Sequence, residues 1–156
     1  MMLPRVMLED DLFEVHAIEK AANRFPWSKK NFSDSLDAGH FGWVYCDAFD
    51  DIIGYAIVQL VIDEAHLLNI CVRPEMQRQG FGRRILEHVI DHAQTRSANL
   101  VILEVRQSNF RAQQLYQQLG FNEMSIRRGY YPAEQGREDA ILMGLDLTSE
   151  SIFGGI

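Results

Sequence analysis

Long apolar runs are missing from this sequence of 156 residues. Its longest uninterrupted apolar stretches have the length of a β-strand, whereas a membrane-spanning helix needs about 20 apolar residues. The N-terminal segment up to Asp11 contains one basic residue, Arg5, and lacks the basic-then-apolar layout of a signal peptide. We therefore expect a cytoplasmic protein that has no membrane partner.

Cysteine is also scarce. The sequence contains two cysteines, Cys46 and Cys71, and each lies in an apolar, strand-like run. This pattern favours buried free thiols over a disulfide or a catalytic pair. Free thiols fit a reducing compartment, and this again indicates the cytoplasm.

Basic residues are fewer than acidic ones. The sequence has 15 Lys and Arg and 22 Asp and Glu residues, which gives a formal net charge of -7. A general nucleic-acid binder needs a basic face that neutralises phosphates, so we expect no direct nucleic-acid partner. An acidic protein is better suited to attract a cationic substrate. With 47% hydrophobic and 24% charged residues, the composition is that of an ordinary globular domain. We expect one domain at residues 1–147 and a flexible tail at residues 148–156.

Hydrophobic periodicity predicts an α/β protein with a mixed sheet. Apolar runs predict seven strands, at residues 3–8, 41–48, 52–62, 65–72, 100–105, 121–128 and 139–147. Helical spacing predicts four helices, at residues 12–22, 28–36, 80–93 and 109–119, with Pro26 and Gly120 as stop signals. The order is not a strict β-α-β alternation, and we expect a mixed sheet with helices on both faces. The last two strands should form a hairpin around residues 129–137.

The segment from Gln77 to Arg83 has the composition of a phosphate-binding turn. It lies between a predicted strand and a predicted helix, and Gly80 and Gly82 let the backbone expose its N–H groups. The helix N-terminus adds unpaired N–H donors and positive potential, and arginines flank the turn. A plain turn is the competing interpretation. The signature glycines of a P-loop and of a Rossmann domain are both missing.

A second segment, residues 109–121, combines an Asn, a Tyr and a Gly-Phe step. Together with the pattern Gln77-x-x-Gly80-x-Gly82 upstream, it resembles the GNAT acetyltransferase superfamily. The resemblance implies a GNAT-like fold of about seven mostly antiparallel strands and about four helices. It also implies acetyl-CoA as co-substrate, no metal, and a set of cofactor-binding residues: Ile70, Cys71, Val72, Arg78, Gln79, Gly80, Phe81, Gly82, Arg83 and Asn109. One N–H of residues 70–72 could hold the oxyanion.

The similarity extends over nearly the whole chain, to about Leu147. Five further segments look like those of RimI-type ribosomal-protein-alanine N-acetyltransferases, at residues 25–28, 69–70, 103–106, 127–132 and 136–140. Enzymes of this type acetylate the N-terminal alanine of small-subunit ribosomal protein number eighteen. By resemblance, the expected partner is therefore the N-terminus of a basic ribosomal protein, and we expect the chain to act as a monomer.

Glu104 is the candidate general base, because an idle carboxylate would be expensive within the apolar strand at residues 101–105. The alternative is an ion pair with Arg106 or another basic residue at the surface. The resemblance favours the base. An N-terminal amine, with a pKa near 8, is roughly one-tenth neutral at pH 7, whereas deprotonating a lysine there costs about 4.6 kcal/mol. A weak base therefore suits an α-amine.

Five other residues have more than one interpretation. Tyr116 is the candidate acid for the departing thiolate, although a lone tyrosine on a helix is by default a core aromatic. Asn109 could cap its helix, contact coenzyme A, or do both. Cys71 could be a nucleophile, but the family transfers the acetyl group directly. His88 and His92 have a spacing that can bind zinc, yet a solvated helix face is the stronger interpretation.

The peptide groove is predicted from loop aromatics and acids. We expect the incoming N-terminus to be flanked by Phe25, Trp27, Tyr130 and Tyr131, with Asp63 and Glu64 attracting its basic residues. Two alternatives to this function stay open. One is a GNAT enzyme that acts on lysine, a polyamine or an antibiotic amine, and the other is a domain that binds acetyl-CoA without catalysis.

Overall fold

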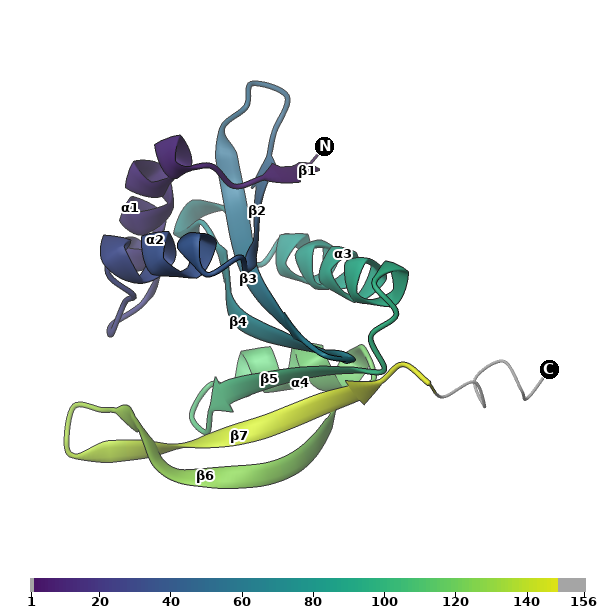
Figure 1. Ribbon diagram of the computed structural model, residues 1–156. Coiled ribbons are helices and arrows are strands. Elements are labelled where there is room, and N and C mark those ends of the chain that lie inside the picture. Colours follow the sequence, from purple (N-terminus) through teal and green to yellow (C-terminus); the bar gives the residue numbers. More distant parts are fainter. Residues whose placement is uncertain (1, 149–156) are drawn as a thin grey trace. The chain divides into compact units, whose positions relative to one another are not determined.

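Seven strands form one mixed sheet in the computed structural model, which describes residues 2–148 (Figure 1). The strands are β1 Leu3–Val6, β2 Phe41–Cys46, β3 Ile52–Val61, β4 Glu64–Val72, β5 Leu100–Arg106, β6 Asn122–Pro132 and β7 Arg137–Asp146. Their hydrogen-bonding order is β1-β2-β3-β4-β5-β7-β6. β4 and β5 are parallel, whereas the β1–β2, β2–β3, β5–β7 and β6–β7 pairs are antiparallel. The predicted α/β class with a mostly antiparallel sheet is confirmed.

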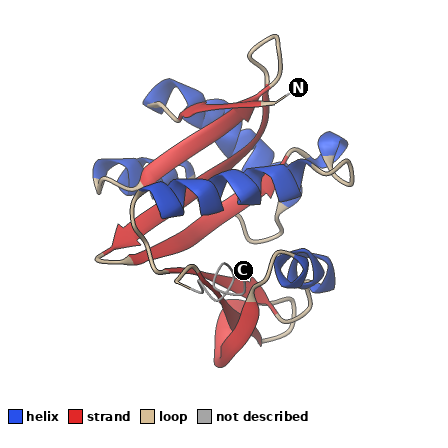
Figure 2. Ribbon diagram, turned by 90° about the vertical axis from the view of Figure 1, so that its right-hand side faces the viewer, coloured by secondary structure: helices blue, strands red, loops and turns tan. Residues whose placement is uncertain are grey.

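Four α-helices accompany the sheet (Figure 2). They are α1 Leu12–Ala22, α2 Lys29–Asp37, α3 Phe81–Thr95 and α4 Phe110–Gln118, with short 3-10 turns at Glu9–Asp11 and Pro74–Met76. α2 begins where the sequence predicts, because the Ser28 hydroxyl accepts the Asn31 N–H at 3.0 Å and the Asn31 side chain accepts the Ser28 N–H. Within residues 2–148, no helix has both the length and the apolar content needed to span a membrane.

The chain folds as two compact units. The first unit holds the residues up to Gln59 and Leu68–Asp91, and the second holds Leu60–Leu67 and the residues from His92 on. The first unit has helices on both faces of its strands, since β2 residues alternate in direction. Val44 and Cys46 belong to a buried cluster with Leu12 of α1 and Phe32 of α2. On the other face, the Tyr45 ring lies edge-on to His88 of α3, with ring centroids 5.3 Å apart.

Gly54 of β3 is required by close packing in the first unit. A Cβ atom at this position would lie 2.5 Å from the carbonyl oxygen of Cys71 and 2.7 Å from the side chain of Ile85. Any larger residue would push α3 and β4 away from β3. Glycine therefore fixes the position of the strand segment and helix that flank the predicted phosphate-binding turn.

The second unit contains the last hairpin, which is longer than the sequence predicts. β6 extends to Pro132 and β7 begins at Arg137, so the predicted loop at residues 129–137 is wrong at both ends. An irregularity in the β6–β7 register between Arg127 and Tyr131, with Gly129 at a φ of +56°, interrupts the alternation that sequence reasoning depends on. The sequence predicts a flexible tail at residues 148–156. Apart from Thr148, this tail lies outside the described residues.

Candidate active site

The predicted phosphate-binding turn leads directly into α3, which begins at Phe81. Its backbone is bent at two positions, because Arg78 has a φ of +64° and Gly80 a φ of +88°. Gly80 adopts this left-handed conformation freely, whereas the arginine adopts it at a cost that is typical of functional turns. The Arg84 N–H donates to the Gly80 carbonyl at 3.2 Å, so the N–H groups of residues 81–83 precede the first intrahelical bond.

The electrostatics at this end of α3 suit an anion. The first turn contains no acidic residue, and the exposed side chains of Arg78 and Arg83 add positive charge. Arg83 has a loose ion pair with Glu87 at 3.5 Å, and Arg84 lies 5.8 Å from the centre of the Phe81 ring. Gln79 and Gly80 are exposed, and Phe81 and Gly82 are half-buried. The chemistry of this turn fits a pyrophosphate group.

The strand segment at residues 70–72 ends at this turn. Ile70 and Val72 are half-buried and Cys71 is buried. The Gln77 side chain donates to the Val72 carbonyl at 3.0 Å and thereby fastens the turn to the strand. Burial raises the pKa of the Cys71 thiol to about 11, so the thiol stays protonated at neutral pH and is a poor nucleophile.

Glu104 lies on β5 with a quarter of its side chain exposed, and two donors from β6 hold its carboxylate. Arg127 Nε pairs with Glu104 Oε2 at 2.6 Å. The Tyr130 hydroxyl donates to Glu104 Oε1 at 2.9 Å. Arg106, the partner considered from the sequence, pairs instead with Glu138 at 3.0 Å. The carboxylate is therefore fixed in place by residues that sequence reasoning did not include among the candidate catalytic groups.

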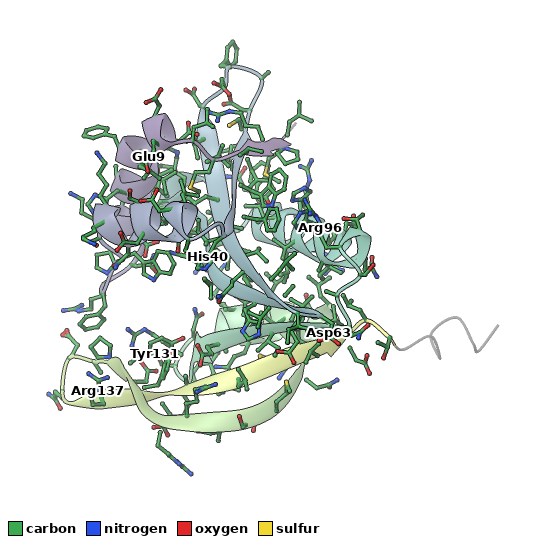
Figure 3. The ribbon with its side chains drawn as sticks, in the orientation of Figure 1. Glu9, His40, Asp63, Arg96, Tyr131 and Arg137 are labelled. Atoms are coloured by element: carbon green, nitrogen blue, oxygen red, sulfur yellow. The ribbon has the colours of Figure 1, made fainter. Side chains whose placement is uncertain are left out.

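A pair of tyrosines from β6 surrounds this carboxylate. The rings of Tyr130 and Tyr131 meet edge to face, 5.0 Å apart, and the Arg106 guanidinium stacks 4.5 Å from the centre of the Tyr131 ring. Burial and the charge of Glu104 raise the pKa of Tyr131, so its hydroxyl stays protonated. Figure 3 labels Tyr131 and Arg137 on the two strands of the hairpin, where Arg137 donates to the Tyr130 carbonyl at 3.0 Å.

Tyr116 and Asn109 lie on α4 in the same unit as Glu104. Tyr116 is buried, and burial raises its pKa to about 12, so the phenol remains a donor at physiological pH. Its ring packs against Phe121 at 5.8 Å. Asn109 caps α4, because its side-chain oxygen accepts the Ala112 N–H at 3.2 Å.

The remaining sequence candidates have local partners. Asp63 accepts the Asn99 amide at 2.8 Å, and Glu64 pairs with His66 at 3.0 Å. Trp27 packs on Phe32, 5.1 Å away, at the edge of the first unit's core. In the described part of the chain, no three His, Cys, Asp or Glu side chains are grouped as a metal would require.

The two units thus gather the predicted site residues into two sets. The first unit holds residues 70–72 and 78–83, and the second holds Glu104, Asn109 and Tyr116. Two residues were missed, namely Arg127, which pairs with Glu104, and Glu19 of α1, whose carboxylate accepts the Trp27 N–H at 2.9 Å. Arg127 gave a weak signal as part of an Arg-Arg-Gly-Tyr-Tyr segment, whereas Glu19 gave none, since it occupies an ordinary position of an amphipathic helix.

Comparison with known proteins shows the family of this chain. The model of the acetyltransferase (GNAT) family matches residues 10–121. The [ribosomal protein bS18]-alanine N-acetyltransferase of Salmonella typhimurium is 46% identical over 143 residues, which cover 92% of this chain and 96% of that protein. The protein of the same name from Haemophilus influenzae is 37% identical over 134 residues, 85% of this chain and 90% of that protein.

Solved structures give the same result. The ribosomal-protein-S18-alanine N-acetyltransferase from Escherichia coli has a TM-score of 0.88 at 44% identity, with 94% of each chain covered. The spermidine/spermine N-acetyltransferase SpeG from Vibrio cholerae has a TM-score of 0.81 over 99% of this chain and 97% of its own, but at 20% identity it shares the fold alone. The predicted resemblance to RimI-type acetyltransferases is confirmed. This chain belongs to the GNAT acetyltransferase family.

Proposed function

We propose that this chain moves the acetyl group of acetyl-CoA directly to the N-terminal alanine of ribosomal protein bS18. The observation that carries the proposal is the 46% identity, over 92% of the chain, to a relative of that name. The likeness to polyamine acetyltransferases is limited to the fold. The proposal includes a cytoplasmic monomer that needs no metal, with residues 1–147 as one acetyltransferase domain.

The turn before α3 would bind the pyrophosphate of acetyl-CoA. Its N–H groups and the arginines at 78 and 83 supply donors and positive charge. Gly80 leaves room for a close approach, since even a Cβ atom added at this position would have nothing within 4 Å. Residues 70–72 would offer backbone groups to the pantetheine arm, and one N–H of this segment would stabilise the oxyanion. Asn109 would contact the cofactor while it caps α4.

Glu104 would accept the proton that the amine loses. The amine nitrogen forms a bond to the thioester carbonyl carbon, the C–S bond breaks, and the amine proton passes to the carboxylate, directly or through a water. Support comes from the two donors on β6 that fix the carboxylate oxygens. A weak base is sufficient, since roughly one α-amine in ten is neutral at pH 7.

Tyr116 would protonate the departing thiolate. Its raised pKa, near 12, keeps the proton on the phenol until a thiolate forms beside it. The phenolate that remains then recovers a proton from solvent. A hydroxyl that was already ionised at pH 7 could not serve this role, and the Tyr116 hydroxyl carries its proton at that pH.

The proposal is tested with two peptides, by measuring the release of free thiol from acetyl-CoA. One peptide has the alanine-led N-terminus of bS18, and the other is the same peptide with a blocked N-terminus and free lysines. We expect turnover on the first alone. Turnover on the second alone would replace α-amine specificity by lysine specificity, and silence on both would contradict the proposed substrate.

A further inference from the structure

Glu19 is the one Asp, Glu, Lys or Arg residue that is buried in the described part of the chain, with 3% of its surface exposed. It lies on the inner face of α1, in line with Val15 and Ile18. Burying a carboxylate is costly unless hydrogen bonds replace the lost water. An apolar side chain would fill the same space at no such cost, so the hydrogen bonds of Glu19 indicate what the carboxylate does.

Three donors from three different segments of the first unit converge on this carboxylate. The Tyr55 hydroxyl, on β3, donates to Glu19 Oε1 at 2.6 Å, and the Asn69 amide, on β4, donates to the same oxygen at 3.2 Å. The backbone N–H of Trp27 donates to Glu19 Oε2 at 2.9 Å. One oxygen is therefore anchored to the sheet, while the other holds the loop at residues 23–28.

This loop joins α1 to α2 and has no regular secondary structure from Asn23 to Ser28. It carries Phe25, which is 39% exposed, and Trp27, whose ring packs on Phe32. Ser28, at its end, is engaged as the cap of α2. Glu19 thus holds the second-to-last residue of a loop that presents an exposed aromatic side chain, and it also accepts a hydrogen bond from Asn69, the strand residue that precedes Ile70.

We propose that Glu19 is a positioning residue that holds the 23–28 loop in the conformation that receives the peptide substrate. The inference rests on the proposed function, because it assigns the loop to that substrate. Glu19 itself acts through the Trp27 N–H and does not contact the reacting atoms. A carboxylate suits this role because it only accepts hydrogen bonds, so it can receive all three donors at once.

The test compares two variants that damage the same buried cluster. Glu19→Met keeps the length of the side chain and removes the acceptor of the Trp27 N–H. Tyr55→Phe is the matched control, since it removes the 2.6 Å bond but leaves the loop bonded to Glu19. We expect Glu19→Met to raise the KM for the peptide roughly tenfold or more and to leave the KM for acetyl-CoA within about twofold. Tyr55→Phe should lower Tm with little change in either KM.

A second measurement does not depend on activity. Amide hydrogen exchange at Trp27 should be slow in the wild type and in Tyr55→Phe, and fast in Glu19→Met. If Glu19→Met does not fold, the double variant Glu19→Met/Tyr55→Phe removes the hydroxyl that the single variant leaves without an acceptor. Two results would overturn the inference. One is a rise in peptide KM in both variants that is proportional to their loss of Tm, and the other is exchange at Trp27 in Glu19→Met that is as slow as in the wild type. If the wild type does not turn over the peptide, the proposed function is overturned instead. The hydrogen-exchange measurement at Trp27 still tests the role of Glu19 in that case.

Discussion

At the scale of single residues, the carboxylate of Glu104 is held by two donors of β6, a strand that β7 separates from β5 in the sheet. Arg127 fixes one oxygen at 2.6 Å and Tyr130 the other at 2.9 Å. A carboxylate that is fixed in this way presents its free lone pairs in a constant direction, which would save the proposed base the cost of being oriented during each turnover. The same two contacts mean that a neutral substitute would lose its attraction to Arg127 as well as its ability to accept a proton.

Glu104→Gln should therefore lower kcat by about 10²-fold or more, in the range expected for loss of a general base. The KM for acetyl-CoA should stay within about twofold, because the turn that we propose binds the pyrophosphate is unchanged. Steady-state kinetics on the bS18 peptide check the result. Glu123→Gln, an exposed substitution on β6, is the control and should behave like the wild type. Full turnover by Glu104→Gln would leave this residue without a role as a base.

The candidate residues that the sequence revealed all lie in local patterns. Arg78 to Arg83 form one contiguous turn, and Asn109 and Tyr116 share a single helix. Glu19 could not be found in this way, because its three donors are 8, 36 and 50 residues away in the chain. Only the folded first unit brings them together. The ion pair of Glu104 with Arg127 was missed for the same reason, since pairing of strands decides it and not spacing along one strand.

At the scale of elements, the turn before α3 should depend on the left-handed backbone of Gly80. An alanine there meets no atom within 4 Å, so its whole effect comes from the φ of +88°, which costs a residue with a Cβ about 1–2 kcal/mol. We expect Gly80→Ala to raise the KM for acetyl-CoA about fivefold to thirtyfold and to leave the KM for the peptide nearly unchanged. Initial rates with each substrate varied in turn would measure both values.

Gly39→Ala is the matched control for this prediction. Gly39 follows α2, has a φ of +85°, and likewise has nothing within 4 Å of a Cβ atom. The two alanines should therefore lower Tm by similar amounts, while only the one at position 80 should affect acetyl-CoA. Equal effects on acetyl-CoA would show that the backbone strain acts through stability and not through the turn.

Most elements were predictable because their signals are local and strong. α2 follows from its capping box, and α3 from one apolar stripe that contains Ile85, Leu86 and Val89. The final hairpin was the exception. The residues of β6 from Asn122 to Arg128 are all exposed. The strand therefore has no alternation of buried and exposed residues that would show where it ends. Pairing with β7 extends β6 to Pro132, and this depends on tertiary contacts that no window of sequence contains.

At the scale of the whole molecule, groups far apart in the chain respond to acid in the same direction. Burial lowers the pKa of His88, although the charge of Asp91 partly opposes this. Burial works to raise the pKa of Asp11, but hydrogen bonds from Arg5 and the Leu8 N–H outweigh it and leave the pKa lowered. Hydrogen bonding from Ser108, with help from Arg106, lowers the pKa of Glu138. In each case the folded protein binds protons less readily than the unfolded chain does.

Acidification should therefore destabilise the fold in two stages. Below the ordinary histidine pKa of about 6.5, the unfolded chain takes up a proton that folded His88 refuses, so stability falls with pH until the lowered pKa is reached. The carboxylates contribute stability above their ordinary pKa of about 4, and this is lost as pH falls through their lowered values. Thermal unfolding between pH 8 and 3 measures both stages. Each kcal/mol lost from the free energy of unfolding should lower Tm by about 2–4 °C.

The first stage can be assigned by substitution. His88→Phe keeps a ring between Trp43 and Tyr45 but cannot titrate. The Tm of this variant should be lower at pH 7.5, because the Tyr45 hydroxyl loses its partner at 2.8 Å. The Tm should then fall less between pH 7.5 and 5.5, because no imidazole is present at this position to take up a proton. Tyr45→Phe is the control, because it removes the same hydrogen bond but keeps the imidazole, and it should keep the wild-type slope. If His88→Phe keeps the full slope as well, the destabilisation in this range comes from other groups, and the burial of His88 in the first unit has no consequence for the response to acid.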